Sequence, residues 1–95
     1  MTKSIVSNDR RCLVCGAPEP LHRHHVFFGT ANRQVSEREG CWVYLCSAHH
    51  NGSNEGVHFN APFDRMLKIH TQWKWMLING RTEEDFRKVF GRSYL

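Results

Sequence analysis

The 95-residue sequence predicts a small α+β domain in which a β-hairpin precedes two helices. Two short runs of β-branched and aromatic residues in the first half indicate the strands. A helical period of apolar residues in the second half indicates the helices. A third observation is the matched spacing of "CLVC" and "CSAH", which frame the predicted hairpin. A domain this short buries only a limited core, and such domains often need an added cross-link such as a metal ion or disulfides.

The charge balance is mildly basic, with 13 Lys and Arg against 9 Asp and Glu. It permits a polyanionic partner without indicating one. No run of about 18 apolar residues predicts a membrane span, and the N-terminus lacks the apolar stretch of a secretion signal. We therefore expect an intracellular, cytoplasmic protein whose thiols stay reduced, so that its four cysteines bind metal more readily than they form disulfides.

The first half of the chain alternates turns and strands. Polar residues 1–10 predict a loose start, and "CLVCG" predicts a tight turn that ends at Gly16. The predicted segments that follow are a strand at 24–28 ("HHVFF"), a polar loop at 29–40, a strand at 41–45 ("CWVYL") and a turn at 51–56 ("NGSNEG").

The second half predicts two helices. Asn60 is a good N-cap for the first, which ends at Asn79-Gly80, and Thr82 begins a second that stops at Gly91. Trp75 lies off the main apolar face and is expected to pack on the second helix, with self-association as the alternative. The residues of the main face, predicted to point at the core, are Phe63, Met66, Leu67, Ile69, His70, Trp73, Met76 and Leu77. The C-terminal apolar anchors are expected to be Phe90, Tyr94 and Leu95.

The two cysteine-containing arms predict a structural zinc site. Cys12 and Cys15 form a CxxC arm, and Cys46 and His49 form a matching CxxH arm. Each two-residue spacer lets one tight turn aim both ligands at one ion, which gives a closed tetrahedral site of three thiolates and one imidazole. Cys41 is the rival fourth ligand, but simple alternation puts it on the strand face opposite Cys46, so we expect a buried apolar thiol.

The remaining histidines suggest a second centre. His24 and His25 are neighbours on a strand, so their side chains point to opposite faces. His50 follows the zinc ligand His49 directly, and His58 lies beyond a short turn that could fold it back. Neutral imidazoles around an open coordination position suit a catalytic metal ion. His22 is expected to be exposed or packed on the knuckle, and His70 to lie in or beside the core.

The motifs "CLVC", "RHHVF", "YLCSAHH" and "GVH" resemble those of HNH (His-Me finger) endonucleases, and their spacing resembles the small phage-encoded members, including the Ref-like group. The resemblance covers residues 12–58. It implies a zinc-stapled, treble-clef-like ββα-metal fold, with residues 1–95 forming one domain and residues 60–95 a helical extension. It also implies a bacterial host or a phage-infected cell.

Carried over residue by residue, the resemblance makes His25 the general base and His24 and His50 ligands of a catalytic Mg²⁺, Mn²⁺, Ni²⁺ or Zn²⁺ ion. His58 would be a third ligand or would contact the scissile phosphate. The family's central Asn, which orients the base, would fall near Cys41, where this chain has no Asn. Asn32 or a backbone carbonyl would then orient the base.

These groups suit metal-assisted hydrolysis of DNA, because a held divalent ion stabilises charge at phosphorus and a neutral imidazole can take a proton from water near pH 7. The alternatives are a zinc-finger module that binds DNA or protein without cutting, and a recombination accessory protein whose activity needs a partner. A second copy of the chain, or a recombination or phage-packaging protein, is the partner expected beside DNA. The candidate phosphate contacts are Arg23, Arg33, Arg38, Arg65 and Lys68.

Overall fold

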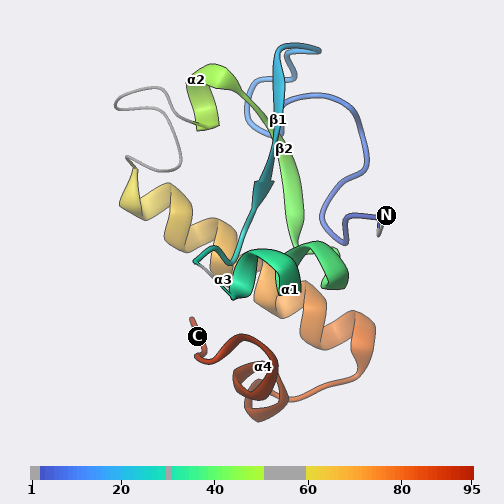
Figure 1. The fold of residues 1–95 in the computed structure, drawn as a ribbon, viewed down its shortest axis with the longest axis vertical. Helices are drawn as coiled ribbons and strands as arrows, with labels where there is room; N and C mark the ends of the chain where they lie inside the picture. The colour runs from blue at the N-terminus through green and yellow to red at the C-terminus, as the bar shows by residue number, and fades with distance from the viewer. Residues whose placement is uncertain (1–2, 30, 51–59) are drawn as a thin grey trace.

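The computed structural model describes residues 3–29, 31–50 and 60–95. It is a small mixed α+β structure, with an antiparallel two-stranded sheet in which His24 lies opposite Val43 and His25 opposite Trp42. Helix α2 follows the sheet at one end and α1 lies at the other (Figure 1). The elements in chain order are β1 (Leu21–His25), α1 (Asn32–Glu39), β2 (Trp42–Cys46), α2 (Ser47–His50), α3 (Ala61–Asn79) and α4 (Glu83–Phe90).

The hairpin differs from the predicted one at its first strand and at its connection. β1 ends at His25, so Val26 and Phe27 leave the sheet and enter the core with no exposed surface. The polar segment predicted as a loop contains α1 instead. Its buried Ser36 hydroxyl donates to the Phe27 carbonyl at 2.7 Å and accepts from the Phe27 N–H at 3.2 Å. This short polar helix is stabilised by contacts with residues distant in the chain. Its own sequence has no apolar period, so the helix could not be predicted from it.

The ends of α3 and α4 are those that the sequence predicts. The Asn60 side chain accepts from the Phe63 N–H at 3.1 Å and caps α3. Thr82 and Asp85 form a reciprocal capping box at the start of α4, with bonds of 3.0 and 3.2 Å. Gly80 and Gly91 end the two helices with positive φ. These boundaries depend on local backbone chemistry, so they can be read from sequence.

The orientation of α3 confirms the prediction only in part: Leu67 is buried, and Phe63 and Met76 pack against the core, but several other residues of the predicted face point to solvent. Its buried side chains are Leu67, Thr71, Gln72 and Trp75. Met66, Trp73 and Leu77, predicted for the core, are 62%, 49% and 76% exposed, and His70 is exposed too. The polar Gln72 is tolerated inside because its amide donates to Ser93 at 2.9 Å and accepts from the Tyr94 N–H at 2.8 Å.

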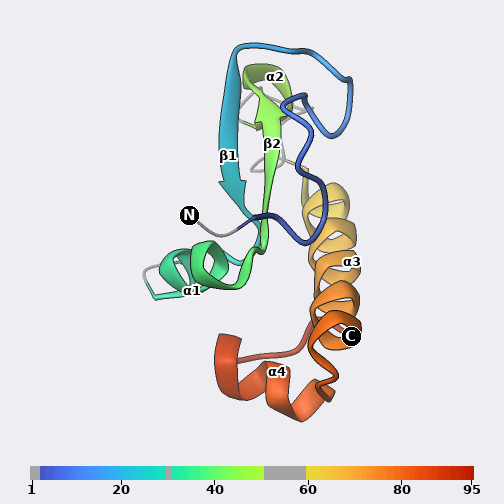
Figure 2. The same cartoon turned by 90° about the vertical axis from the view of Figure 1, so that its right-hand side faces the viewer.

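An aromatic cluster fixes that orientation. Trp75 packs edge-on against Phe86 and Phe90 of α4, with ring centroids 5.5 and 6.0 Å apart, which confirms its predicted contact with the second helix. Phe27 meets Phe86 and Phe90 at 5.1 and 4.7 Å. Tyr94 joins at 5.5 Å from Phe27, whereas Leu95 is 46% exposed and is no anchor. Helix α4 thus closes the structure beneath the hairpin, with α3 along one side (Figure 2).

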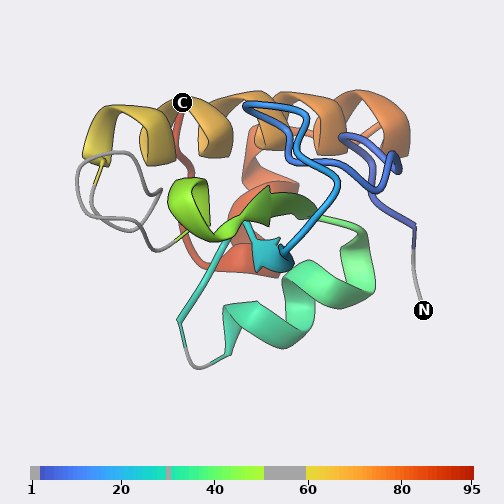
Figure 3. The same ribbon diagram turned by 90° about the horizontal axis from the view of Figure 1, so that it is seen from above.

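The N-terminal segment is not loose where the structure describes it. Ser4 is buried, its hydroxyl donates to the Trp42 carbonyl at 2.5 Å, and the Ile5 N–H donates to the Gly40 carbonyl at 2.9 Å. The segment then runs between β2 and α3 (Figures 2 and 3). Gly40 ends α1 with φ of +76°, and a Cβ added there would collide with the Lys3 carbonyl oxygen.

We therefore expect Gly40→Ala to destabilise the fold by about 2–4 kcal/mol, since the left-handed backbone and the collision both oppose a side chain. Gly80→Ala is the matched control: φ is +60°, with open space around the added carbon. It should cost only about 1–2 kcal/mol. Denaturant unfolding, with the same zinc concentration in every sample, measures both changes. Equal losses would mean that the N-terminal segment does not press on Gly40.

Candidate metal centre

Two separate turns bring four metal-ligand side chains to one point. Cys12 and Cys15 lie in a turn closed by the Gly16 N–H bond to the Cys12 carbonyl at 2.9 Å. The turn is fixed to the sheet because the Leu13 N–H donates to the Tyr44 carbonyl at 2.9 Å. Cys46 ends β2, and α2 then carries His49 back toward the same point. The hairpin thus positions both arms.

The ligand atoms have the spacing of a tetrahedral site. All four lie within 4.8 Å of one another. The sulfurs of Cys15 and Cys46 are 3.7 Å apart, and His49 Nδ1 lies 3.7 Å from Cys12 Sγ and 3.2 Å from Cys46 Sγ. Ligand atoms about 2.3 Å from a tetrahedral zinc ion are about 3.8 Å apart, whereas a disulfide needs about 2.05 Å. The Cys₃His cluster could therefore bind a metal ion and is compatible with structural zinc.

The electrostatics of the cluster favour thiolates at Cys12 and Cys46. At Cys15 the Ala17 N–H acts to lower the pKa, but burial and the sulfurs of Cys12 and Cys46 raise it overall. Burial raises the pKa of the Cys12 thiol, but backbone N–H groups, that of Cys46 foremost, donate to its sulfur and lower the pKa overall to about 6. The pKa of Cys46 is also lowered, first by the backbone N–H of His49. The Cys46 sulfur in turn raises the pKa of His49. Amide groups that point at sulfur prepare it to act as a metal ligand.

Cys41 is not part of this cluster, as the alternation of the strand predicted. It has no exposed surface, and burial raises the pKa of its thiol far above the ordinary value. Its backbone serves the fold, since the Cys41 carbonyl accepts from the Val26 N–H at 2.9 Å and its own N–H donates to Ser36. Cys41 is therefore a buried, protonated core residue.

A group of histidines lies beside the metal cluster. His24 of β1 is buried, and its ring centroid lies 5.3 Å from that of His50 in α2. His22, two residues earlier on the same strand face, stacks on His50 at 5.0 Å, and its Nε2 lies 3.1 Å from the Ser47 hydroxyl. The structure thus brings together His24 and His50, two of the predicted catalytic ligands, and adds His22. His58, the third predicted ligand, lies outside the described residues.

His25 points to the other side of the sheet, where it meets an acid that no sequence motif indicates. Its Nε2 lies 3.4 Å from Glu37 Oε1 in α1. Arg23 donates to both oxygens of Glu37 at 2.8 and 2.9 Å, and its guanidinium stacks 3.8 Å from the centre of the Trp42 ring. Burial acts to raise the pKa of Glu37, whereas hydrogen bonds from Arg23 and His25 bring it below its ordinary value. A carboxylate therefore faces His25.

Asn32, one of two candidates for orienting His25, is used elsewhere. Its side-chain amide donates to the Phe90 carbonyl at 2.9 Å and links α1 to α4. The contact of Glu37 with His25 follows only once residues 32–39 are known to form a helix, because that helix directs the Glu37 side chain toward β1. No apolar pattern signals that helix.

The five cations predicted to contact phosphate are spread over three elements. Arg33 and Arg38 are exposed on α1, and Arg65 is exposed on α3. Arg23 is held by Glu37, as described above. Lys68 is bound to Asp64 at 2.8 Å, with its side chain only 12% exposed. Arg33 and Arg65 are therefore the members of this set most open to a polyanion, since Arg38 Nε lies 3.3 Å from the Glu39 carboxylate.

Comparison with models of protein families, with curated proteins and with solved structures finds no match to this chain. Within the described ranges, no helix has both the length and the apolar character needed to cross a membrane. The class of protein must therefore be inferred from the residues and their geometry.

We predict that Cys15→Ser will lose the metal ion and Cys41→Ala will keep it, although Cys15 is exposed and Cys41 fully buried. Removing a ligand should weaken zinc binding by more than the ~10–100-fold typical of changes outside the ligand shell. Metal content after dialysis against a weak chelator measures the difference, and thermal unfolding should show the same order. Zinc retained by Cys15→Ser would remove Cys15 from the ligand set.

Proposed function

We propose that the chain is a metal-dependent HNH (His-Me finger) endonuclease that hydrolyses phosphodiester bonds of DNA. The observation that carries the proposal is the approach of His24 and His50, with His25 next along the strand. The Cys₃His cluster lies beside them, since His49 and His50 are neighbours in α2. The resemblance of the sequence to that family implies a metal site that holds two strands and a short helix together. It also implies imidazoles on both faces of the hairpin.

The separation of His24 and His50 suits a shared ion. Two imidazoles that bind one tetrahedral ion at about 2.0–2.1 Å have ring centroids about 5 Å apart, close to the 5.3 Å between these rings. His24 is buried, so its ring has little freedom and the ion position would be fixed by the strand. A divalent ion held there by His24 and His50 would supply Lewis-acid stabilisation of the phosphate and of the leaving oxygen.

His25 is the proposed general base. With Nε2 directed at the Glu37 carboxylate, the proton of a neutral imidazole resides on Nε2, and Nδ1 keeps the lone pair that accepts a proton from water. Glu37 thereby takes the orienting place for which the chain has no central Asn. Arg23 holds Glu37 by two hydrogen bonds, so the carboxylate is fixed as well as charged.

We predict that His25→Ala will lower the rate of metal-dependent cleavage of supercoiled plasmid by about 10²–10⁴-fold, the range of general-base catalysis. Zinc content and the far-UV spectrum should not change, because His25 is outside the Cys₃His cluster. Purified protein is stripped of loosely bound metal and then given Mg²⁺, Mn²⁺ or Ni²⁺. His70→Ala, an exposed histidine on α3, is the matched control and should cleave normally.

Cleavage by His25→Ala at the wild-type rate would remove His25 from this role.

A second function is favoured by one observation. Among the described residues, the Cys₃His cluster is the only group of at least three His, Cys, Asp or Glu side chains whose ligand atoms converge. If no metal supports cutting while DNA is still retarded in a gel, the chain is a zinc-stapled binding module. If cutting appears only with a recombinase filament, it is a recombination accessory nuclease.

For Glu37→Gln we expect a smaller loss than for His25→Ala, about 10–100-fold in kcat, because the amide keeps the shape but not the charge that fixes the imidazole. The KM for DNA should change little, and Glu37→Asp should recover part of the rate. Nitrogen chemical shifts of His25 provide the independent measurement, since they report which ring nitrogen carries the proton. An unchanged tautomer in Glu37→Gln would show that Glu37 does not orient the base.

A further inference from the structure

The imidazole of His22 contacts both ends of helix α2. Its Nε2 lies 3.1 Å from the hydroxyl of Ser47, the first residue of the helix. Its ring stacks on that of His50, the last residue, with centroids 5.0 Å apart and planes inclined by 29°. His22 itself belongs to β1, every residue of which pairs with β2. One side chain of the sheet therefore touches the start and the end of the helix that carries His49 and His50.

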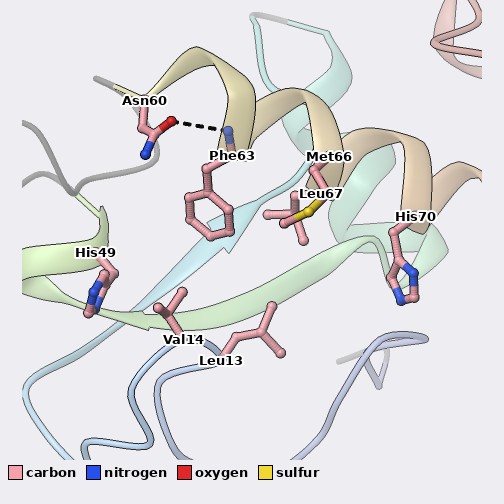
Figure 4. Close-up of a pocket in the computed structure, with 8 residues that line it drawn as sticks. All are labelled: Leu13, Val14, His49, Asn60, Phe63, Met66, Leu67 and His70. Atoms are coloured by element: carbon pink, nitrogen blue, oxygen red, sulfur yellow. Dashed lines mark hydrogen bonds between the residues drawn. The ribbon is translucent and has the colours of Figure 1, made fainter.

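Helix α2 has little stability of its own. It is a single turn of four residues, and so short a helix is marginal without tertiary contacts. On the side of α3, a cavity of about 650 Å³ lies beside it, lined by His49, by Leu13 and Val14 of the first metal-binding turn, and by Phe63 of α3. Figure 4 shows His49 at one end of this cavity. The position of α2 therefore depends on the metal ligand His49 and on the contacts with β1.

His22 serves neither the core nor a metal ion directly. Its side chain is exposed, so it buries little apolar surface and contributes little to the free energy of folding. An ion bound to an imidazole lies in the plane of the ring, whereas His22 turns its face to His50 and its Nε2 to Ser47. Within the described part of the chain, it belongs to no group of converging ligand atoms. What its contacts do is restrict the ring of His50.

We propose that His22 is a positioning residue that holds the ring of His50 where His50 and His24 can share a divalent ion. The inference rests on the proposed function, because it concerns the ion of that function. Burial fixes the ring of His24, and Glu37 holds the general base His25. His22 gives His50 the corresponding restraint. Side chains outside the ligand shell commonly orient metal ligands in this way.

Titration of the zinc-loaded chain with Mn²⁺ tests the proposal, with free Mn²⁺ followed by electron paramagnetic resonance. Thiolates favour zinc over Mn²⁺, so the Cys₃His cluster should keep its zinc. The wild type should bind Mn²⁺, and His22→Ala should bind it about 10–100-fold more weakly, the range for contacts outside the ligand shell. His70→Ala, which removes an exposed histidine on α3, is the matched control and should bind Mn²⁺ like the wild type.

Two further variants separate the stacked ring from the hydrogen bond. His22→Phe keeps a flat ring beside His50 and should bind Mn²⁺ more tightly than His22→Ala. Ser47→Ala removes only the contact with Nε2 and should weaken binding less than His22→Ala does. Ring-proton chemical shifts of His50, measured without Mn²⁺, provide a measurement that needs no ion: they should change in His22→Ala and largely return in His22→Phe. Loss of zinc from His22→Ala would overturn the proposal, because the contact would then support the Cys₃His cluster instead.

Cleavage of supercoiled plasmid separates positioning from chemistry. Because His22 acts through the bound ion, His22→Ala should regain most of the wild-type rate at saturating Mn²⁺. A loss of rate that persists at saturation would overturn the positioning role, and so would equal Mn²⁺ affinities of His22→Ala and the wild type. Either result would leave the proposed nuclease intact. A wild type that binds no Mn²⁺ would instead overturn the shared ion of His24 and His50, and this inference with it.

Discussion

The convergence of Cys12, Cys15, Cys46 and His49 on one point is the constraint on which the rest of the structure depends. The four ligands come from a turn that precedes the hairpin and from the strand and helix that end it. In a chain of 95 residues a bound ion would contribute directly to folding free energy, because the unfolded chain has no such site. Holding both arms together also fixes the register of β1 and β2, since Leu21 lies opposite the ligand Cys46. That register decides which imidazoles share a face.

The opposite end of the molecule is stabilised by apolar packing. Phe27, Phe86 and Phe90 form an aromatic cluster with no more than 2% exposure, and Trp75 joins it from α3. Ser36 binds both backbone groups of Phe27, so α1 is attached at the residue where the chain leaves the sheet. The hairpin therefore lies between a polar, metal-binding end and an apolar end. Each end restrains a strand that would be marginal alone, as two-stranded sheets are.

The proposed catalytic groups lie between these two restraints. His24 and His50 meet at the metal-binding end because α2 begins directly after β2. His25 is restrained from the other side, by Glu37 of α1, and α1 in turn is attached to the aromatic end through Asn32 and Ser36. The two faces of one strand are thus controlled by two different parts of the fold. In the proposed nuclease, the ion and the base would therefore be positioned by separate parts of the fold.

The sequence by itself determined everything that depends on neighbours along the chain. The ligands Cys12, Cys15, Cys46 and His49, the caps at Asn60 and Thr82, and the helix ends at Gly80 and Gly91 all follow from local spacing or backbone conformation. Only the tertiary structure decided that residues 32–39 are helical, that Glu37 meets His25, and that α3 turns Thr71 and Gln72 inward. The physical reason is that these features depend on distant partners, namely Phe27, Arg23 and the rings of α4. An apolar period shows that one side of a helix is apolar, but it does not show whether that side contacts the helix's own chain or another molecule.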